Sequence, residues 1–260
     1  MKRAGLLVGF VLAAGMVGAC SSASPAKLTV FGASSLASTL TDLGPKWTAT
    51  HPNNQLETST GSSAALRTQI EQGAPADVFL SADTSNPQAL VDGGLATGPV
   101  TTFATNSLVI IVPTANPAGI TSAADLAKAG VCVIAAGDDV PITKYATKLV
   151  ANLAALPDYG SAFADGYTAN ICSKEDNVGA VVSKVALGEG DAAIVYVTDA
   201  LGTSGLTTID VPAGANVIAN YGGVAIKASA GAALGAEFLA WLRGTDAQQV
   251  LAAHGFAAAP

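Results

Sequence analysis

Short apolar runs alternate with helical stretches along the chain after residue 26. Leu36, Leu40, Leu43 and Trp47 recur at steps of four, three and four, which places them on one helical face after a first strand at 27–31. Further apolar runs predict strands at 55–60, 77–81, 107–112, 131–135, 167–171, 192–197 and 222–226. Helical periods and Gly stops predict helices at 64–72, 122–129, 142–156, 178–187, 232–243 and 245–254. Such β-α repetition specifies mainly parallel sheets flanked by helices.

Two apolar, strand-like segments at 107–112 and 222–226 enclose about a hundred residues, the size of a typical domain. We interpret these segments as the two crossings of a hinge in an α/β protein of two lobes. Lobe I then comprises residues 27–104 and 212–260, and lobe II comprises residues 105–211. A Gly44-Pro45 pair inside the first helical period predicts a kink or an early stop there.

The first nineteen residues are typical of a secretion signal. Lys2 and Arg3 precede an uncharged apolar run at 4–19 that is too short for a reliable membrane span. The run ends in Val-Gly-Ala-Cys at 17–20, which resembles the site cleaved by the lipoprotein signal peptidase. We therefore predict a signal peptide at 1–19, an acylated (palmitate-bearing) Cys20 and a tether at 20–26, which would anchor the protein on the extracytoplasmic face of the cell membrane. An ordinary signal peptide with a chance cysteine is the alternative.

The composition limits the kinds of partner that this protein can bind. Charged residues make up 12% of the chain and the net charge is −7, so no basic stripe exists to neutralise nucleic-acid phosphates. Cys132 and Cys172 form an even pair in an oxidising compartment, which favours a disulfide over two free buried thiols. A bare metal cation is a weaker interpretation, because both histidines, His51 and His254, lie far from these cysteines in sequence.

Candidate chemistry lies where strands lead into helices, because α/β sheets bind ligands beyond the carboxyl ends of their strands. Two such junctions carry consecutive serines, ending at Ser35 and at Ser63. Free backbone N–H groups and the helix dipole attract an anion to a helix start, and a serine hydroxyl adds one donor. Either serine cluster alone is more typical of a helix N-cap, and it is the occurrence of two such junctions that favours a binding site.

Three further donors are candidates for the same site. Pro141 suits a first helical turn and leaves the amide of Ile142 free to point out of the helix start. Asn177 begins another helix and offers the same kind of amide, and Tyr196 ends a strand with a phenol hydroxyl. Taken alone, Tyr196 is more typical of a core aromatic residue.

Several short segments are distributed in order along nearly the whole chain after residue 26. The most specific is Gly-Ala-Pro-Ala-Asp-Val-Phe-Leu-Ser-Ala-Asp at 73–83. The others are Val-Phe-Gly-Ala-Ser-Ser-Leu at 30–36, Gly-Ser-Ser at 61–63, Gln-Ile at 69–70, Asn-Ser-Leu-Val at 106–109, Ile-Val-Tyr at 194–196, Asp-Ala at 199–200 and Gly-Phe at 255–256. Together these segments resemble the molybdate-binding proteins of ATP-driven (ABC) importers.

The resemblance implies a hinge-closing receptor with a type II periplasmic-binding-protein fold and the ligand in the cleft between its lobes. It implies a molybdate or tungstate ligand, delivery to a membrane permease, no cofactor, no enzymatic activity and a monomer. The implied ligand set comprises the hydroxyls of Ser35, Ser63 and Tyr196 and the amides of Ile142 and Asn177. A dianion that only accepts hydrogen bonds suits such a set.

Other functions remain open at this point. The ligand would be another oxyanion, sulfate or phosphate, if the donors fit it better, and an inward-pointing Asp138 or Asp139 would favour phosphate. Lys144 is a possible counter-charge, though a solvated helix lysine is more typical. A secreted serine hydrolase is disfavoured, because the chain has no Gly-x-Ser-x-Gly elbow and neither His51 nor His254 has an acidic residue at a telling spacing.

Overall fold

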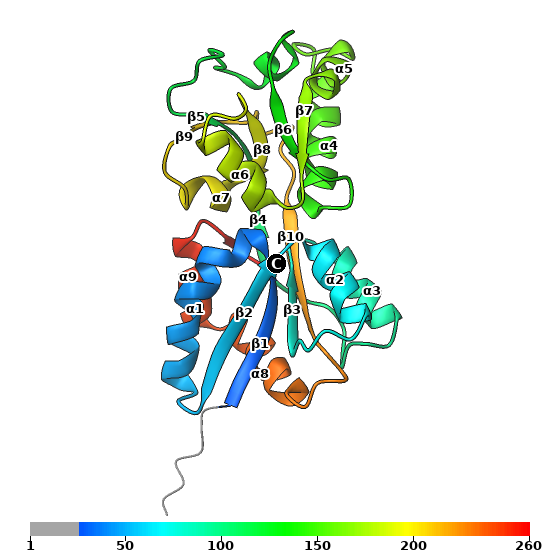
Figure 1. The fold of residues 1–260 in the computed structure, drawn as a ribbon, viewed down its shortest axis with the longest axis vertical. Coiled ribbons are helices and arrows are strands. Elements are labelled where there is room, and N and C mark those ends of the chain that lie inside the picture. Colours follow the sequence, from blue (N-terminus) through cyan, green and yellow to red (C-terminus); the bar gives the residue numbers. More distant parts are fainter. Residues whose placement is uncertain (1–25) are drawn as a thin grey trace, which may run out of the picture.

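The computed structural model describes residues 26–260, which form two α/β lobes stacked along the long axis of the molecule (Figure 1). The predicted signal peptide at 1–19, Cys20 and all but the last residue of the predicted tether lie outside the described residues. Within residues 26–260, every helix is too short or too polar to cross a bilayer.

The first lobe is built on a six-stranded sheet with the order β11-β4-β10-β3-β1-β2. Its strands are β1 (Ala26–Ala33), β2 (Asn54–Gly61), β3 (Val78–Ser81), β4 (Thr101–Asn106), β10 (Ala219–Ala225) and β11 (Ala257–Ala258). Its helical segments are η1 (Ser34–Leu36), α1 (Ala37–Thr50), α2 (Ser63–Glu71), α3 (Ser85–Asp92), α8 (Ala232–Leu242) and α9 (Thr245–Ala253). β1, β2 and β3 run parallel, whereas β10 is antiparallel to both β3 and β4.

Alternation along β1 explains why helices cover both faces of this sheet. Leu28 and Val30 belong to the core that α1 and α8 close with Trp47 and Phe238, whereas Phe31 belongs to a second core beneath α2 and α3. Figure 1 shows α1 and α9 on one side of the strands and α2 and α3 on the other. The carboxyl ends of β1, β2 and β3 therefore emerge together at one edge of the lobe.

The second lobe contains strands β5 (Leu108–Pro113), β6 (Val133–Ala136), β7 (Ile171–Glu175), β8 (Ala193–Tyr196) and β9 (Leu206–Ile209). Its helical segments are η2 (Ala123–Ala127), α4 (Pro141–Ala154), α5 (Ala162–Ala169), α6 (Val178–Ala186) and α7 (Val197–Leu201). β5 lies between β8 and β9 and is antiparallel to both, while β6 and β7 are parallel. A parallel bridge between Val133 and Ala192 connects the two groups of strands.

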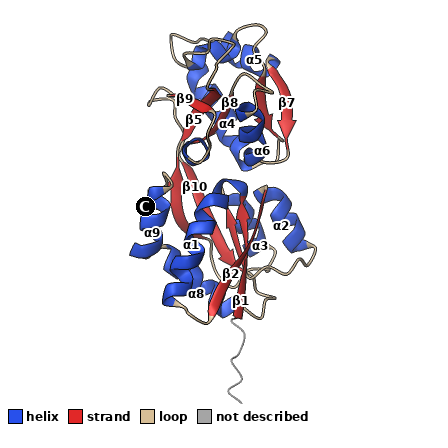
Figure 2. Ribbon diagram, turned by 60° about the vertical axis from the view of Figure 1, so that its left-hand side comes forward, coloured by secondary structure: helices blue, strands red, loops and turns tan. Residues whose placement is uncertain are grey.

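The chain passes between the lobes twice. It leaves the first lobe between β4 and β5, around Ser107, and returns between β9 and β10 (Figure 2). The segments 107–112 and 222–226 are thus mostly strands inside the lobes, rather than the crossings themselves. Asn216, on the returning crossing, ties the two together: its Oδ1 accepts from the Leu108 amide at 3.1 Å and its Nδ2 donates to the Leu108 carbonyl at 2.8 Å.

Two local predictions differ from the structure. The helix through Gly44-Pro45 does not stop early, because Leu40, Leu43 and Trp47 bury one face while Pro45 lies on the exposed face, where water can satisfy the carbonyl that lost its donor. The strand predicted at 167–171 is wrong, because Ala162–Ala169 forms α5 and the strand begins only at Ile171.

A mixed pattern of strand directions also replaces the mainly parallel sheets that the β-α repetition predicted. The repetition misses β4 and β9, which follow no long helix and pair antiparallel to their neighbours. It also misses the helices α3, α5 and α7, which are only five to eight residues long. Short elements carry too few periods of apolar residues for the pattern to register.

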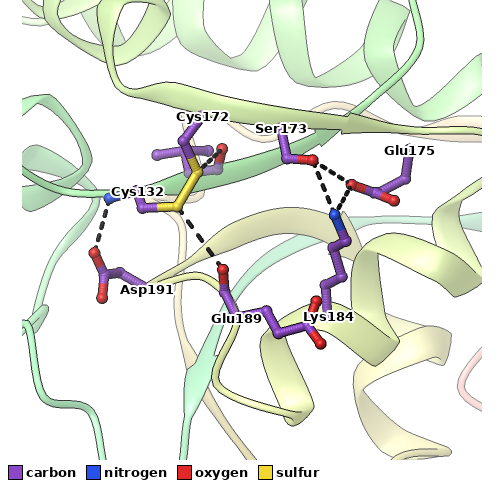
Figure 3. Close-up of a disulfide and its surroundings, with 8 residues drawn as sticks. Cys132, Cys172, Ser173, Glu175, Lys184, Glu189 and Asp191 are labelled. Carbon is purple, nitrogen blue, oxygen red and sulfur yellow. Dashed lines mark hydrogen bonds and ion pairs between the residues drawn. A yellow bond between two sulfur atoms is a disulfide. The ribbon is translucent and has the colours of Figure 1, made fainter.

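A disulfide links Cys132, just before β6, to Cys172 in β7, with 5.3 Å between the two Cα atoms (Figure 3). The amide of Cys132 donates to Asp191 Oδ2 at 2.8 Å. Beside it, Lys184 pairs with Glu175 at 2.8 Å, and this bond holds the pKa of the Glu175 carboxyl below its usual range. The covalent link therefore fastens β7, at the edge of the second lobe, to the strand next to it.

Replacing both cysteines, as Cys132→Ser with Cys172→Ser, is expected to lower the free energy of unfolding by roughly 3–4 kcal/mol, because the bond closes a loop of 40 residues. Urea unfolding of the wild type with and without reductant gives the same comparison. Reductant should leave the free energy of unfolding of the double variant unchanged. Equal unfolding midpoints for oxidised and reduced wild type would contradict a stabilising disulfide.

Candidate ligand-binding site

A small cavity lies between the two lobes and is partly open to solvent. Its walls come from the ends of β1, β2 and β3 in the first lobe and from the starts of α4 and α6 and the end of β8 in the second. The lining residues are Ala33, Ser34, Ser35, Gly61, Ser62, Ser63, Ala82, Val140, Pro141, Ile142, Val178 and Tyr196. Drug-sized ligands occupy pockets of about 300–1,000 Å³, and this cavity is far smaller, so it suits only a small ligand.

Four helical segments begin at this cavity. They are η1, which continues into α1, and α2, α4 and α6, with N-caps at Ala33, Ser62, Val140 and Asn177. The first turn of a helix leaves backbone N–H groups without intrahelical acceptors, and the helix dipole adds positive potential there. The cavity is therefore surrounded by hydrogen-bond donors from both lobes.

Ser35 and Ser63 each have their oxygen in contact with a fixed partner. Ser35 Oγ lies 2.8 Å from Tyr221 Oη, and Ser63 Oγ accepts from the Ala82 amide at 3.2 Å. The turn that contains Ala82 is held by Asp83, whose carboxylate accepts from Ser81 Oγ and from the Asn86 amide at the start of α3. Ser63 thus accepts a hydrogen bond from the protein and keeps its own O–H free to donate.

Two other hydroxyls at the cavity are buried without a hydrogen-bond partner among the described residues, Ser62 Oγ and Tyr196 Oη. Ser62 stands at the N-cap of α2, yet its side chain does not cap that helix. Burial raises the pKa of Tyr196 well above its ordinary value, so its phenol stays protonated and is a donor. A buried donor without an acceptor costs roughly 1–3 kcal/mol, so both hydroxyls favour an acceptor in the cavity.

The second lobe contributes Ile142 and Val178 to the cavity wall. Ile142 follows Pro141, the first residue of α4, as the sequence predicted. Asn177 itself is not among the lining residues: it is the N-cap of α6, and its Oδ1 accepts from the Ala180 amide at 3.0 Å. The next residue, Val178, takes the position in the wall that the sequence assigned to Asn177.

Contacts within α6 narrow the choice of amide further. The Gly179 amide donates across the lobes to Ser34 Oγ at 3.4 Å, and the Val181 amide donates to the Asn177 carbonyl at 3.3 Å. Together with the capped Ala180, these bonds leave the Val178 amide without an acceptor among residues 26–260. Val178 is therefore the first-turn donor of α6 that remains free at the cavity.

Comparison with known proteins adds the family. The sequence model of the family of bacterial extracellular solute-binding proteins matches residues 28–257. This chain belongs to that family. It is 35% identical to the molybdate-binding protein ModA of Mycobacterium tuberculosis, over 99% of both chains.

Two solved structures of solute-binding proteins resemble the fold. The periplasmic molybdate-binding protein of Azotobacter vinelandii is 26% identical, with a TM-score of 0.76 over 90% of this chain and all of that one. The sulfate-binding protein SubI of Mycobacterium tuberculosis has a TM-score of 0.78 at 19% identity, over 89% of this chain and 86% of that one, and shows the fold alone. The predicted two-lobed periplasmic-binding-protein fold is confirmed.

The walls of the cavity in this solute-binding protein carry no ionised side chain among the described residues. Asp138 pairs with Lys174 at 2.5 Å on the surface, and Asp139 is absent from the lining as well. Lys144 donates to Ser85 Oγ at 3.1 Å, across the lobes and away from the cavity wall. The electrostatic character of the site therefore comes from dipoles.

Asp199 is a buried carboxyl group that contacts the cavity wall through Tyr196. Its Oδ2 accepts from the Tyr196 amide at 3.3 Å at the start of α7, and it lines a neighbouring cleft together with Ser34 and Ser35. Burial raises the pKa of Asp199 to about 7. The carboxyl group is therefore partly protonated near neutral pH, which weakens its repulsion of an anion held beyond Tyr196.

Both histidines have acidic partners that the sequence did not reveal. His51 pairs with Glu237 at 3.1 Å, and His254 pairs with Asp42 at 2.8 Å. Ser38 Oγ lies 3.4 Å from the other ring nitrogen of His254, so serine, histidine and aspartate stand in a row. These three residues lie on the exposed side of α1 and link α9 to it. They are open to water, unlike the groups of a catalytic site that excludes it. The family to which the chain belongs is one of solute-binding proteins rather than enzymes.

Sequence reasoning missed Ser34, Ser62 and Val178 as wall residues. Ser34 and Ser62 each precede a serine that was selected, and the pattern alone could not decide which of two consecutive serines faces the ligand. The Val178 difference arises from a one-residue ambiguity in where α6 begins. An N-cap asparagine before an apolar run was the available signal, since Asn is a preferred N-cap residue.

Proposed function

We propose that this protein binds molybdate, and also tungstate, outside the cytoplasm and delivers it to the membrane permease of an ABC importer. The family, and the 35% identity to a molybdate-binding protein over the full length, support this assignment. The observation that carries it is the small cavity between the lobes, with hydroxyl and amide donors in its walls and two buried hydroxyls that lack acceptors.

The proposed ligand set comprises the hydroxyls of Ser35, Ser63 and Tyr196 and the amides of Ile142 and Val178, with Val178 in place of Asn177. Ser62 is an additional donor. A fully ionised tetrahedral dianion accepts hydrogen bonds and donates none, so donors alone satisfy it. Phosphate is partly protonated at neutral pH and would need an acceptor in the wall. The lining offers no carboxylate for that purpose among the described residues.

Calorimetric titration with molybdate, tungstate, sulfate and phosphate should show tight binding of the first two and much weaker binding of sulfate, whose shorter bonds leave donors unfilled. Ser35→Ala and Ser63→Ala should each weaken molybdate binding by roughly 1–3 kcal/mol, because each removes a buried donor. Ser183→Ala, at an exposed serine of α6 that is not part of the cavity wall, is the matched control. Equal affinity for sulfate and molybdate would refute the molybdate assignment. Unchanged molybdate affinity in both serine variants would show that these serines cap their helices and do not bind the ligand.

The amide of Val178 can be removed without removing the helix. Val178 is the first residue of α6, where proline is tolerated, and the extended backbone of Asn177 (φ −160°, ψ 167°) suits a residue before proline. Val178→Pro should therefore weaken molybdate binding by roughly 1–3 kcal/mol. Val178→Ala also shortens the side chain but retains the N–H, so it serves as the control. Equal losses in the two variants would show that side-chain packing, rather than the amide, accounts for the effect.

We also propose that the mature chain begins at an acylated Cys20 and acts as a monomer held at the extracytoplasmic face of the membrane. The Val-Gly-Ala-Cys sequence at 17–20 supports the acylation, and an anchor would keep the receptor near its permease. Detergent partition of cell fractions should place the wild type in the membrane fraction and Cys20→Ser in the soluble one. An identical distribution of the two proteins would rule out the anchor at Cys20.

A further inference from the structure

A chain of hydrogen bonds leads from the hinge to the cavity. Asn106 is the last residue of β4, and its Nδ2 donates to Thr198 Oγ1 of α7 at 2.9 Å and to Tyr221 Oη at 3.4 Å. Its Oδ1 accepts from the Ser107 amide at 3.0 Å. Because the carbonyl oxygen already faces a backbone donor, the orientation of the amide is fixed, and the NH₂ group faces Thr198 and Tyr221.

The direction of the next bond follows from that orientation. Tyr221 Oη lies 2.8 Å from Ser35 Oγ, and either oxygen could be the donor on distance alone. An amide nitrogen has no acceptor site, so the phenol proton of Tyr221 cannot go to Asn106. Ser35 Oγ is then the acceptor of that proton, and the O–H of Ser35 is left to donate into the cavity whose wall it forms.

Packing holds the phenol in this position. Tyr221 has no solvent exposure, and its ring meets those of Phe103, Phe256 and Tyr196 edge-on, at centroid distances of 6.3, 5.1 and 5.6 Å. A bulge between Tyr221 and Gly222 breaks the register of β10 with β4 at this residue. The hydroxyl of Tyr221 meets Ser35 in η1, just beyond the end of β1.

We propose that Tyr221 is a positioning residue that makes Ser35 an obligate hydrogen-bond donor to the ligand, and so favours oxyanions without protons over those that carry one. Ser63 has the same polarity, because a backbone amide occupies its oxygen. An oxyanion with an O–H group needs an acceptor, and both serines are set to donate. The inference deepens the proposed function and rests on it.

Tyr221→Phe tests the inference, because it removes the hydroxyl and keeps the ring. Freed from its partner, the Ser35 hydroxyl loses its bias toward the cavity, and molybdate affinity at pH 7 should fall about fivefold by calorimetry. Affinity for hydrogen phosphate should not fall, so the ratio of the two affinities should narrow by the same factor. Tyr145→Phe alters a tyrosine of the same aromatic cluster that does not contact Ser35, and should leave both affinities unchanged.

A double-mutant cycle with Ser35→Ala separates positioning from packing. If Tyr221 acts through Ser35, then adding Tyr221→Phe to Ser35→Ala should cause no further loss of molybdate affinity. Additive losses, or an unchanged ratio of molybdate to phosphate affinity in Tyr221→Phe, would overturn the inference.

Two further measurements keep the outcome decisive. If thermal unfolding shows that Tyr221→Phe does not fold, Asn106→Ala replaces it in the cycle, because it removes the donor that fixes the Tyr221 proton, and it must meet the same criterion of non-additivity. Failure of the wild type to bind molybdate would refute the proposed function itself. If the wild type binds molybdate but the losses of affinity in the two single variants add up in the double variant, only the role of Tyr221 is refuted.

Discussion

The first turn of a helix has backbone N–H groups that its own helix cannot satisfy, and the rest of this structure is arranged around four such turns meeting at one cavity. Removing a doubly charged anion from water is costly unless each of its acceptor sites finds a donor. Lysine or arginine could supply the charge, but these cations are as readily satisfied by any carboxylate or phosphate. Amides and hydroxyls on rigid elements give less charge and a fixed geometry, which is what discrimination between oxyanions of similar charge requires.

Fixed donors depend on a supporting layer that does not touch the ligand. Asp83 illustrates this layer: its carboxylate is buried, accepts from Ser81 and Asn86, and thereby holds the turn whose Ala82 amide bonds to Ser63. The Gly-Ala-Pro-Ala-Asp stretch has a similar task at the other end of β3, where Asp77 accepts from the Thr29 amide at 2.6 Å and from Ser229. The acidic residues of the most distinctive segment thus brace strands and turns, and neither of them lines the cavity.

Much of the site could be predicted from the sequence, because its parts are local. A strand followed by serines and a helical period predicts a helix start with hydroxyls, and Ser35, Ser63, Ile142 and Tyr196 lie in one cavity wall. The features that could not be predicted are contacts between residues far apart in the sequence. The partnership of Ser35 with Tyr221 spans 186 positions, and the antiparallel entry of β10 beside β3 leaves no periodic trace. Asn177 and Val178 differ by one residue, which is within the uncertainty of any helix boundary read from a pattern.

The site is divided between the lobes, so the cavity exists only in the arrangement that brings them together. Ser34 accepts from Gly179 and Lys144 donates to Ser85 across the gap, but these bonds are few and partly exposed, so they add little on their own. The paired crossings at Leu108 and Asn216 restrict how the lobes can swing without fixing how closed they are. An anion that bonds to α2 on one side and to α4 and α6 on the other would therefore stabilise the closed arrangement more than any of these direct contacts. Affinity and lobe closure are then one equilibrium, since a ligand shifts a conformational balance only by as much as it prefers one state.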